Sequence, residues 1–465
     1  MADVQASTNT GDSMVLRDSE VKAFQSRLRG KVLRSGDDGY DEARTVWNGM
    51  IDRRPALIAC CAGVADVMTT VNFARKYQLL VSMRGGGHNV AGNAVCDGGL
   101  MIDLSSMTGI RVDPVARMAR VEPGVLWGEL DHETQAFGLA TTGGFISTTG
   151  VAGLTLGGGQ GWLASKYGFS IDNLLSVDVV IADGTLLTAS VTQNEDLFWA
   201  MRGAGHNFGV VTSFEYQLHP VSSVLGGMVV HTIDRAADVL RFYRAFTADL
   251  PDELTTSVAI LTAPIGIRVI SIIVCYTGSI DEGQRVLEPL LTFGSPVLNT
   301  IAPIPYIKQQ TMNDESFPHG RLNYWRSGLT DELNDGVIAA LVDYAGRMPS
   351  KLSAITIADF HGASRRVGKT EMAYHHRDLR YDILLAANWT DPAETESNMA
   401  WTREGYEALQ AHLPQGVYVN DLDRDEGLER VMQAYGENYE RLAMLKKKYD
   451  PTNFFRVNQN IKPAI

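Results

Sequence analysis

Apolar positions in the first part of the chain alternate between short runs of strand character and stretches with helical spacing. Residues 55–61 (PALIACC) predict a short buried strand, and strand character returns at 79–83 and 100–104. Between the first two runs, apolar residues recur at the i, i+3, i+4, i+7 spacing of a helix over 66–76. A strand, a helix and a further strand in this order predict an α/β arrangement, in which ligands bind at strand ends.

Turn signals organise the next stretch. Asp-Pro within 109–122 and Asp-Gly within 177–189 each separate two runs of strand character, which predicts two hairpins. A helix is expected over 125–137, a helical turn or two over 196–202, and a strand over 210–218.

After His219-Pro220 the pattern changes, because glycine clusters disappear and amphipathic strands alternate with long helices. This alternation predicts a second, α+β lobe with an antiparallel sheet. Its expected strands are 227–232, 257–261, 267–276, 354–360 and 381–389, and its expected helices are 235–249, 282–291, 332–348 and 394–412.

Two glycine-rich stretches carry the candidate chemistry. Residues 81–92 read VSMRGGGHNVAG, and residues 141–168 hold nine glycines, a density that disfavours ordinary helices and strands. The first stretch alone fits either a flexible turn with a surface histidine or an anion loop beside His88. Neither stretch has the G-x-G-x-x-G fingerprint between a strand and a helix, which argues against a doubly wound dinucleotide fold.

Charge and cysteine content exclude several classes of function. A formal net charge of −13 and a pI of about 5.3 disfavour nucleic acid and anionic membranes as partners. Four cysteines form neither a disulfide framework nor a metal-binding pattern, and no metal site is expected. The N-terminal residues lack a signal-peptide pattern, so we expect a cytoplasmic protein with a frayed tail of about 15 residues.

Five motifs in order resemble the berberine bridge enzyme-like flavoprotein oxidases, which have the vanillyl-alcohol-oxidase or PCMH type of FAD-binding fold. The resemblance covers nearly the whole chain. The motifs are R-G-G-G-H-N at 84–89, G-G-G-x-G at 157–161, Y-G-x-x-x-D-N at 167–173, R-G-x-G-x-N-F-G-V-V at 202–211, and the C-terminal Y-D-P-x-N-x-F-R-x-N-Q-N-I.

The resemblance implies an α+β fold with an FAD domain formed by both chain ends and an inserted substrate domain on an antiparallel sheet. We therefore predict an FAD-binding domain over 16–220, a substrate-binding domain over 221–425, and a segment over 426–465 that returns to the FAD domain.

The same resemblance implies the cofactor site. His88 is expected to bond covalently to the 8α-methyl of FAD, and 143–153 holds no cysteine for a second link. The other implied cofactor contacts are Arg84, Gly85, Gly86, Gly87, Asn89, Gly92, Gly143, Thr148, Gly150, Gly153, Val211, Tyr418, Asn420 and Asn458.

Catalysis in such a family needs a base beside the reacting C–H bond. Some relatives supply a tyrosine from Y-x-N-Y, but here the segment reads Tyr418-Val419-Asn420-Asp421. The candidates for the base are therefore Tyr418, Asp421 and Tyr381, the last on a strand expected to face the flavin.

Three functions stay open at this point. The first is an oxidase that passes a hydride from a small alcohol, hemiacetal or amine to FAD, with O₂ as acceptor and H₂O₂ as product. The second is a tailoring enzyme of secondary metabolism, in which flavin oxidation or oxygenation drives cyclisation or rearrangement. The third is a non-catalytic FAD-binding protein.

Overall fold

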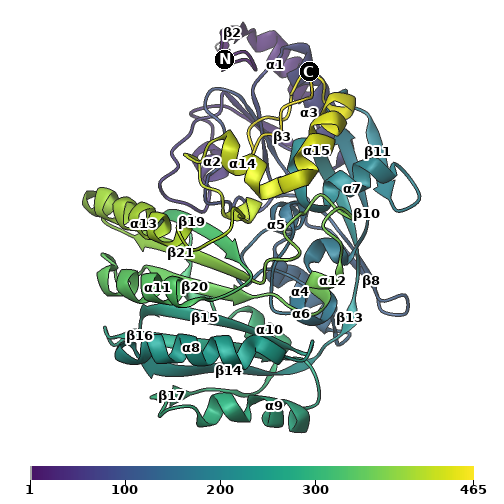
Figure 1. The fold of residues 1–465 in the computed structure, drawn as a ribbon. Helices are drawn as coiled ribbons and strands as arrows, with labels where there is room; N and C mark the ends of the chain where they lie inside the picture. The colour runs from purple at the N-terminus through teal and green to yellow at the C-terminus, as the bar shows by residue number, and fades with distance from the viewer. Residues whose placement is uncertain (1–2) are drawn as a thin grey trace.

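The computed structural model describes residues 3–465, and a small mixed sheet lies in the N-terminal part of the chain (Figure 1). The strand order is β3-β4-β6-β5, in which β4 and β5 both run parallel to β6. Helix α3 (Val64–Lys76) packs its apolar face against this sheet through Val67 and Val71. The predicted strands and helix of this region are thus confirmed. The strands are β3 Lys31–Leu33, β4 Leu57–Cys60, β5 Val81–Arg84 and β6 Leu100–Asp103.

A second sheet of five antiparallel strands follows, in the order β11-β10-β12-β8-β7. Both predicted hairpins are present, since β7 pairs with β8 and β10 pairs with β11. The strands are β7 Ile110–Asp113, β8 Met118–Val121, β10 Leu174–Ile181, β11 Leu186–Ser190 and β12 Gly209–Gln217, and the accompanying helices are α4 Trp127–Gln135 and α7 Glu195–Ala204.

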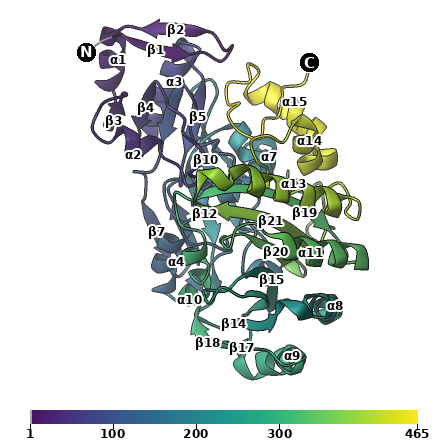
Figure 2. The same cartoon turned by 90° about the vertical axis from the view of Figure 1, so that its left-hand side faces the viewer.

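The middle of the chain forms one eight-stranded antiparallel sheet, in the order β17-β14-β16-β15-β20-β21-β19, with β18 pairing β14. Helices cover one face of it (Figure 2), and their apolar residues join those of the sheet in a single core. The strands are β14 Ser223–Thr232, β15 Leu254–Thr262, β16 Arg268–Tyr276, β17 Leu298–Asn299, β18 Ala302–Pro305, β19 Leu322–Thr330, β20 Ala354–Asp359 and β21 Tyr381–Trp389. The helices are α8 Ala236–Phe246, α9 Ile280–Thr292, α11 Asp335–Arg347 and α13 Thr395–Gln410.

The C-terminal segment returns to the N-terminal part of the chain (Figure 1). Helices α14 (Leu428–Tyr435) and α15 (Tyr439–Tyr449) lead into it, and α15 packs against α7. Phe454 and Phe455 are buried in the core of the first sheet. Both ends of the chain therefore build one unit, and the antiparallel sheet is inserted between them.

Two expectations about local structure were wrong. The first residues do not form a frayed tail, because β1 (Val4–Ser7) pairs with β2 (Ser13–Leu16) and buries Ala6 and Leu16. The glycine-rich stretch does contain helices, α5 (Val151–Gly157) and α6 (Ala164–Tyr167), although both are short. Tertiary packing outweighs intrinsic propensity in both places.

Smaller elements complete the chain. Within residues 3–465, no helix is long and apolar enough to cross a membrane. The remaining helices are α1 Asp18–Gln25, α2 Tyr40–Arg44, α10 Tyr306–Gln310 and α12 Ala363–Arg366, and a small sheet pairs β9 Leu139–Ala140 with β13 His219–Pro220.

Candidate functional site

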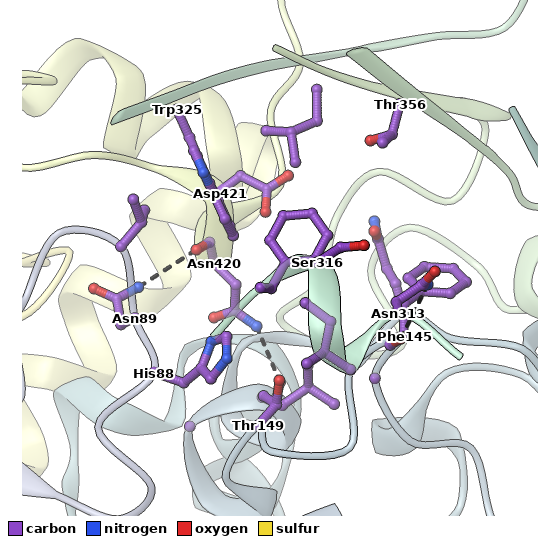
Figure 3. A pocket seen from close by; sticks show the side chains of 18 of the residues that line it. His88, Asn89, Phe145, Thr149, Asn313, Ser316, Trp325, Thr356, Asn420 and Asp421 are labelled. Carbon is purple, nitrogen blue, oxygen red and sulfur yellow. Dashed lines mark hydrogen bonds between the residues drawn. The ribbon is translucent and has the colours of Figure 1, made fainter. Parts of the chain in front are cut away.

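A cavity of about 800 Å³ lies where the two chain ends meet the uncovered face of the eight-stranded sheet. Its wall includes the loop after β5, the segment 144–154 around the start of α5, and residues 418–421 and 457–459. Figure 3 shows side chains from the first three of these segments converging on the cavity, among them His88, Thr149 and Asp421. The sequence motifs that lie far apart in the chain therefore meet at one site.

The loop after β5 approaches the start of α5 so closely that only glycine fits. A Cβ added to Gly86 would lie 2.6 Å from the Cα of Gly150, and one added to Gly85 would lie 2.7 Å from the carbonyl oxygen of Pro123. Gly87 has a φ of 67°, in the left-handed region that favours glycine. These three glycines line the cavity with bare backbone, as a loop that holds a bulky anionic group must.

His88 projects from this loop into the cavity and stacks on Trp47, with ring centroids 4.4 Å apart and planes at 16°. Its Nε2 is buried without a hydrogen-bond partner. Burial lowers the pKa of His88 to about 4, so the imidazole is neutral at neutral pH. A neutral imidazole with a free nitrogen is a nucleophile. Trp47 was missed by the sequence analysis because it stands in a loop outside any motif.

Most of the predicted cofactor contacts line the cavity. The Asn89 side chain also donates to the backbone oxygen of Asn420 at 3.4 Å, which links the loop after β5 to the C-terminal segment (Figure 3). The lining residues are Gly85, Gly86, Gly87, His88, Asn89, Gly150, Gly153, Val211, Tyr418, Asn420 and Asn458.

Four predicted contacts do not line the cavity. The Arg84 guanidinium donates to the backbone oxygen of Ala43, and Thr148 is exposed while its neighbour Thr149 lines the wall. The remaining two pack against other side chains: Gly92 leaves room for Ile51, and Gly143 leaves room for Trp127.

Tyr418 and Asp421 come from the C-terminal side of the cavity, at the 3₁₀ turn η7 (Val419–Asp421). The Tyr418 hydroxyl oxygen accepts hydrogen bonds from the backbone N–H of Gly159 at 2.9 Å and from Asn420 Nδ2 at 2.7 Å. Burial raises the pKa of Tyr418, so it stays a neutral phenol. Burial also raises the pKa of Asp421, and the charge of Asp382 adds to this effect.

The expectation that Tyr381 faces the site was wrong. Its hydroxyl lies 2.7 Å from Thr247 Oγ1, in the core between the sheet and its helices, and Ile383 and Leu385 share that face. Side chains alternate along a strand, so the next residue, Asp382, faces the cavity instead. Asp382 was not among the predicted site residues, although a single acid within the apolar strand YDILLAANW is the signal that marks it.

The residues present fit an FAD. Several buried polar atoms in the cavity wall have no hydrogen-bond partner in the described structure, as expected where a ligand completes the bonding. These atoms are His88 Nε2, Asn89 Oδ1, His206 Nε2 and Asn458 Oδ1. The bare glycine loop suits a pyrophosphate, and the described residues contain no cluster of histidine, cysteine or acidic side chains for a metal ion.

Comparison with known proteins agrees with this cofactor. The profile of an FAD binding domain matches residues 55–190, and that of a berberine and berberine-like segment matches residues 417–462. An FAD-linked oxidoreductase of Dictyostelium discoideum is 34% identical over 95% of this chain and 97% of its own length. An (R)-6-hydroxynicotine oxidase of Paenarthrobacter nicotinovorans is 32% identical over 94% of this chain and 97% of its own length.

Solved structures give the same assignment. The crystal structure of 6-hydroxy-D-nicotine oxidase from Arthrobacter nicotinovorans matches with a TM-score of 0.86 at 32% identity, covering 94% of this chain and 98% of that one. A carbohydrate oxidase from Microdochium nivale shares the fold, with a TM-score of 0.85 at 24% identity over 96% and 100% of the two chains. The chain belongs to the berberine bridge enzyme-like FAD-linked oxidoreductases.

Proposed function

We propose that the protein is an FAD-dependent oxidase that carries its flavin covalently through His88 and oxidises a small alcohol, hemiacetal or amine. The hydride passes from substrate to FAD, and O₂ takes the electrons to give H₂O₂. The observation that carries the proposal is the neutral His88 imidazole, whose unpartnered Nε2 lies in the cavity wall beside the bare glycine loop.

A single covalent link is the form that the residues support. The cavity wall, as the described residues form it, contains no cysteine, and all four cysteines of the chain are buried elsewhere. Trp47 holds the His88 ring by stacking, which fixes the direction in which Nε2 points. Stacking of this kind restricts the imidazole to one orientation before any bond forms.

Bound FAD supplies a two-electron acceptor, and the protein must orient the substrate and take its proton. Tyr418 is suited to orientation, because its oxygen already accepts two hydrogen bonds and its raised pKa keeps the proton available for donation. Asp421, with its carboxyl in the same cavity, is the proton acceptor that we propose.

Acid precipitation of the purified protein tests the covalent link. Flavin should stay in the pellet of the wild-type protein and should appear in the supernatant of His88→Ala. His206→Ala is the matched control, because His206 also lines the cavity with an unpartnered Nε2 and a pKa lowered to about 4 by burial. Flavin wholly in the wild-type supernatant, or retained by His88→Ala, contradicts the proposal.

Peroxide release tests the oxidase reaction. The holoenzyme should produce H₂O₂ with at least one class in a panel of alcohols, reducing sugars and amines. Mass spectrometry of the products separates simple oxidation from the alternative, in which the oxidation drives a cyclisation or rearrangement.

A further inference from the structure

Asp382 is a buried acid whose carboxyl lies beside the neutral amide of Gln160 and keeps one oxygen without a hydrogen-bond donor. Its carboxyl is in the cavity wall, the residue is 4% exposed, and Oδ1 has no partner among the described residues. Its cross-strand neighbours are Leu329 of β19 and Ala358 of β20, and neither side chain can donate. Burying such a group is unfavourable, so a ligand that brings its own donor would complete the site.

Asp421 brings a second carboxyl to the same cavity from η7, and in Figure 3 it points into the cavity. Burial raises the pKa of both acids, and the charge of Asp382 raises that of Asp421 further. Two acids in one dry site resist double ionisation, because the first negative charge opposes the second. Near neutral pH this carboxyl pair, Asp382 and Asp421, therefore carries at most one negative charge and keeps at least one proton.

Arginines on the neighbouring elements are already engaged by other acids. Arg377 donates to both carboxylate oxygens of Asp172, at 2.9 and 2.6 Å. The other two pairs are Arg326 with Asp425 and Arg380 with Asp359, the latter on the helix-covered side of the sheet. None of these three guanidinium groups is free to balance the carboxyl pair.

The side chains that face the carboxyl pair are neutral or acidic. They come from every element packed around it: Gln160, Tyr374, Tyr418, Ser327 and Glu426. Burial raises the pKa of both tyrosines, and Glu426 accepts from Arg430 at 2.9 Å.

The basic side chains that line the cavity do not neutralise the carboxyl pair. His88 and His206 have their pKa lowered to about 4 by burial and are neutral. Arg321 donates to the backbone oxygen of Ser316, and Lys351 is exposed to solvent. None of the basic side chains that line the cavity is therefore a buried cation that neutralises the pair.

The rest of the sheet wall offers little to a polyhydroxylated ligand. Val230, Ile273 and Leu384 contribute apolar surface, whereas the hydroxyls are those of Ser257, Thr262, Ser271 and Thr356. Two of these hydroxyls are occupied, because Ser257 donates to the backbone oxygen of Ile357 and Ser271 to that of Ala259. A mainly apolar ligand with one charged group matches such a wall better than a sugar does.

We propose that the carboxyl pair binds the protonated nitrogen of an amine with an apolar body and then accepts its proton, a choice of substrate class that rests on the proposed function above. The ammonium N–H donates to the pair, and the two charges cancel. Proton transfer breaks one N–H bond and forms one O–H bond, which leaves a neutral amine with its lone pair. That lone pair would form the C=N bond of an iminium ion as the adjacent C–H bond breaks, and the hydride would go to the FAD that the proposed function supplies as the two-electron acceptor.

Titration of the holoenzyme with matched probes tests this inference, with the flavin absorbance spectrum as the readout. The probes are N,N-dimethylbenzylamine as the cation, benzyl methyl ether as its uncharged analogue, and phenylacetate as the anion. The amine should bind at least about tenfold more tightly than the ether at neutral pH, and phenylacetate should bind least.

Single substitutions test whether the carboxyl pair, and not another acidic side chain of the cavity, binds the amine. Asp382→Asn and Asp421→Asn should each weaken the amine by about tenfold or more and leave the ether unchanged. Glu315→Gln is the control, since Glu315 also lines the cavity but is exposed. In the wild type, amine affinity should fall between about pH 7 and pH 5, as the pair takes up its second proton, while ether affinity stays constant.

Equal affinity for amine and ether, or wild-type amine affinity in Asp382→Asn, overturns the inference. The charge preference of the wild-type protein is measurable even where a variant fails to fold. Reduction of the flavin by a sugar, with no binding of the amine, rejects the carboxyl pair and leaves the proposed oxidase function intact. Failure of every substrate class to reduce the flavin rejects the oxidase function instead.

Discussion

At the scale of single residues, we expect Asp131 of α4 to make the stability of the folded protein depend on pH. It is 2% exposed, its Oδ2 has no hydrogen-bond partner in the described structure, and burial raises its pKa well above 3.8. The folded protein thus binds a proton that the unfolded chain releases, so stability falls as pH rises from about 3.8 through the folded pKa. Asp131→Asn imitates the protonated form and removes this loss.

The expected result is a thermal midpoint that exceeds the wild-type value by more at about pH 8 than at about pH 5, where each kcal/mol corresponds to roughly 1 °C for a chain of this length. Glu404→Gln, an exposed carboxyl on α13, should show no such pH-dependent difference. Equal shifts at both pH values would mean that Asp131 is ionised in the folded protein.

Some predicted site residues line the cavity through their backbone. Gly86 and Gly150 were implied by the family resemblance, and the close backbone contact between them is a physical reason for glycine at both positions. The face of the sheet on which a strand side chain lies is harder to predict from sequence, since a shift of one residue exchanges the two faces. The choice of Tyr381 over Asp382 failed for this reason, because both faces of β21 are buried and its pattern is almost uniformly apolar.

At the scale of elements, glycine substitutions in α5 and in the loop after β5 should affect folding and cofactor binding differently. A Cβ at Gly153 meets no protein atom within 4 Å, yet Gly153 lines the cavity, so Gly153→Ala should keep the fold and lose flavin. Alanine favours a helix over glycine by up to about 1 kcal/mol, so the apoprotein should be at least as stable as wild type. Gly86→Ala should lower both stability and flavin content, because its Cβ would meet the backbone of Gly150.

Absorbance of bound flavin per protein and the thermal midpoint of the apoprotein measure the two effects. Gly346→Ala on α11 is the control, since its Cβ is also free of neighbours and it lies outside the cavity wall. Full flavin content in Gly153→Ala would show that the cofactor does not approach α5.

Elements were predicted where their hydrophobic pattern was periodic. Strands β15, β16 and β21 follow the expected hydrophobic pattern. Strand β19 reads LNYWRSGLT, and it was not predicted because four residues interrupt the pattern: Asn323, Arg326, Ser327 and Gly328. Those polar side chains are accommodated by partners far away in sequence, such as Asp425 for Arg326. Long-range pairing of this kind cannot be read from local periodicity.

At the scale of the whole molecule, one buried ammonium joins three segments that close the flavin end of the cavity. Lys446 of α15 is fully buried and donates to Asp450 Oδ2 at 2.7 Å, to the backbone oxygen of Asn207 at 2.6 Å and to that of Phe455 at 2.8 Å. The loop that holds Asn207 and the segment that follows Phe455 both reach the cavity wall. Lys446 therefore fixes the C-terminal return against the N-terminal part of the chain.

Lys446→Met should lower the free energy of unfolding by about 3–5 kcal/mol, because it leaves the Asp450 carboxylate buried without its partner. Lys448→Met is the matched control on the same helix: Lys448 pairs with Asp196 at 2.6 Å but is 58% exposed, so its loss should cost at most about 1 kcal/mol. Urea unfolding followed by tryptophan fluorescence measures both variants. Similar small shifts for the two lysines would show that the C-terminal return is held by the packing of Phe454 and Phe455 instead, with the ammonium contributing little.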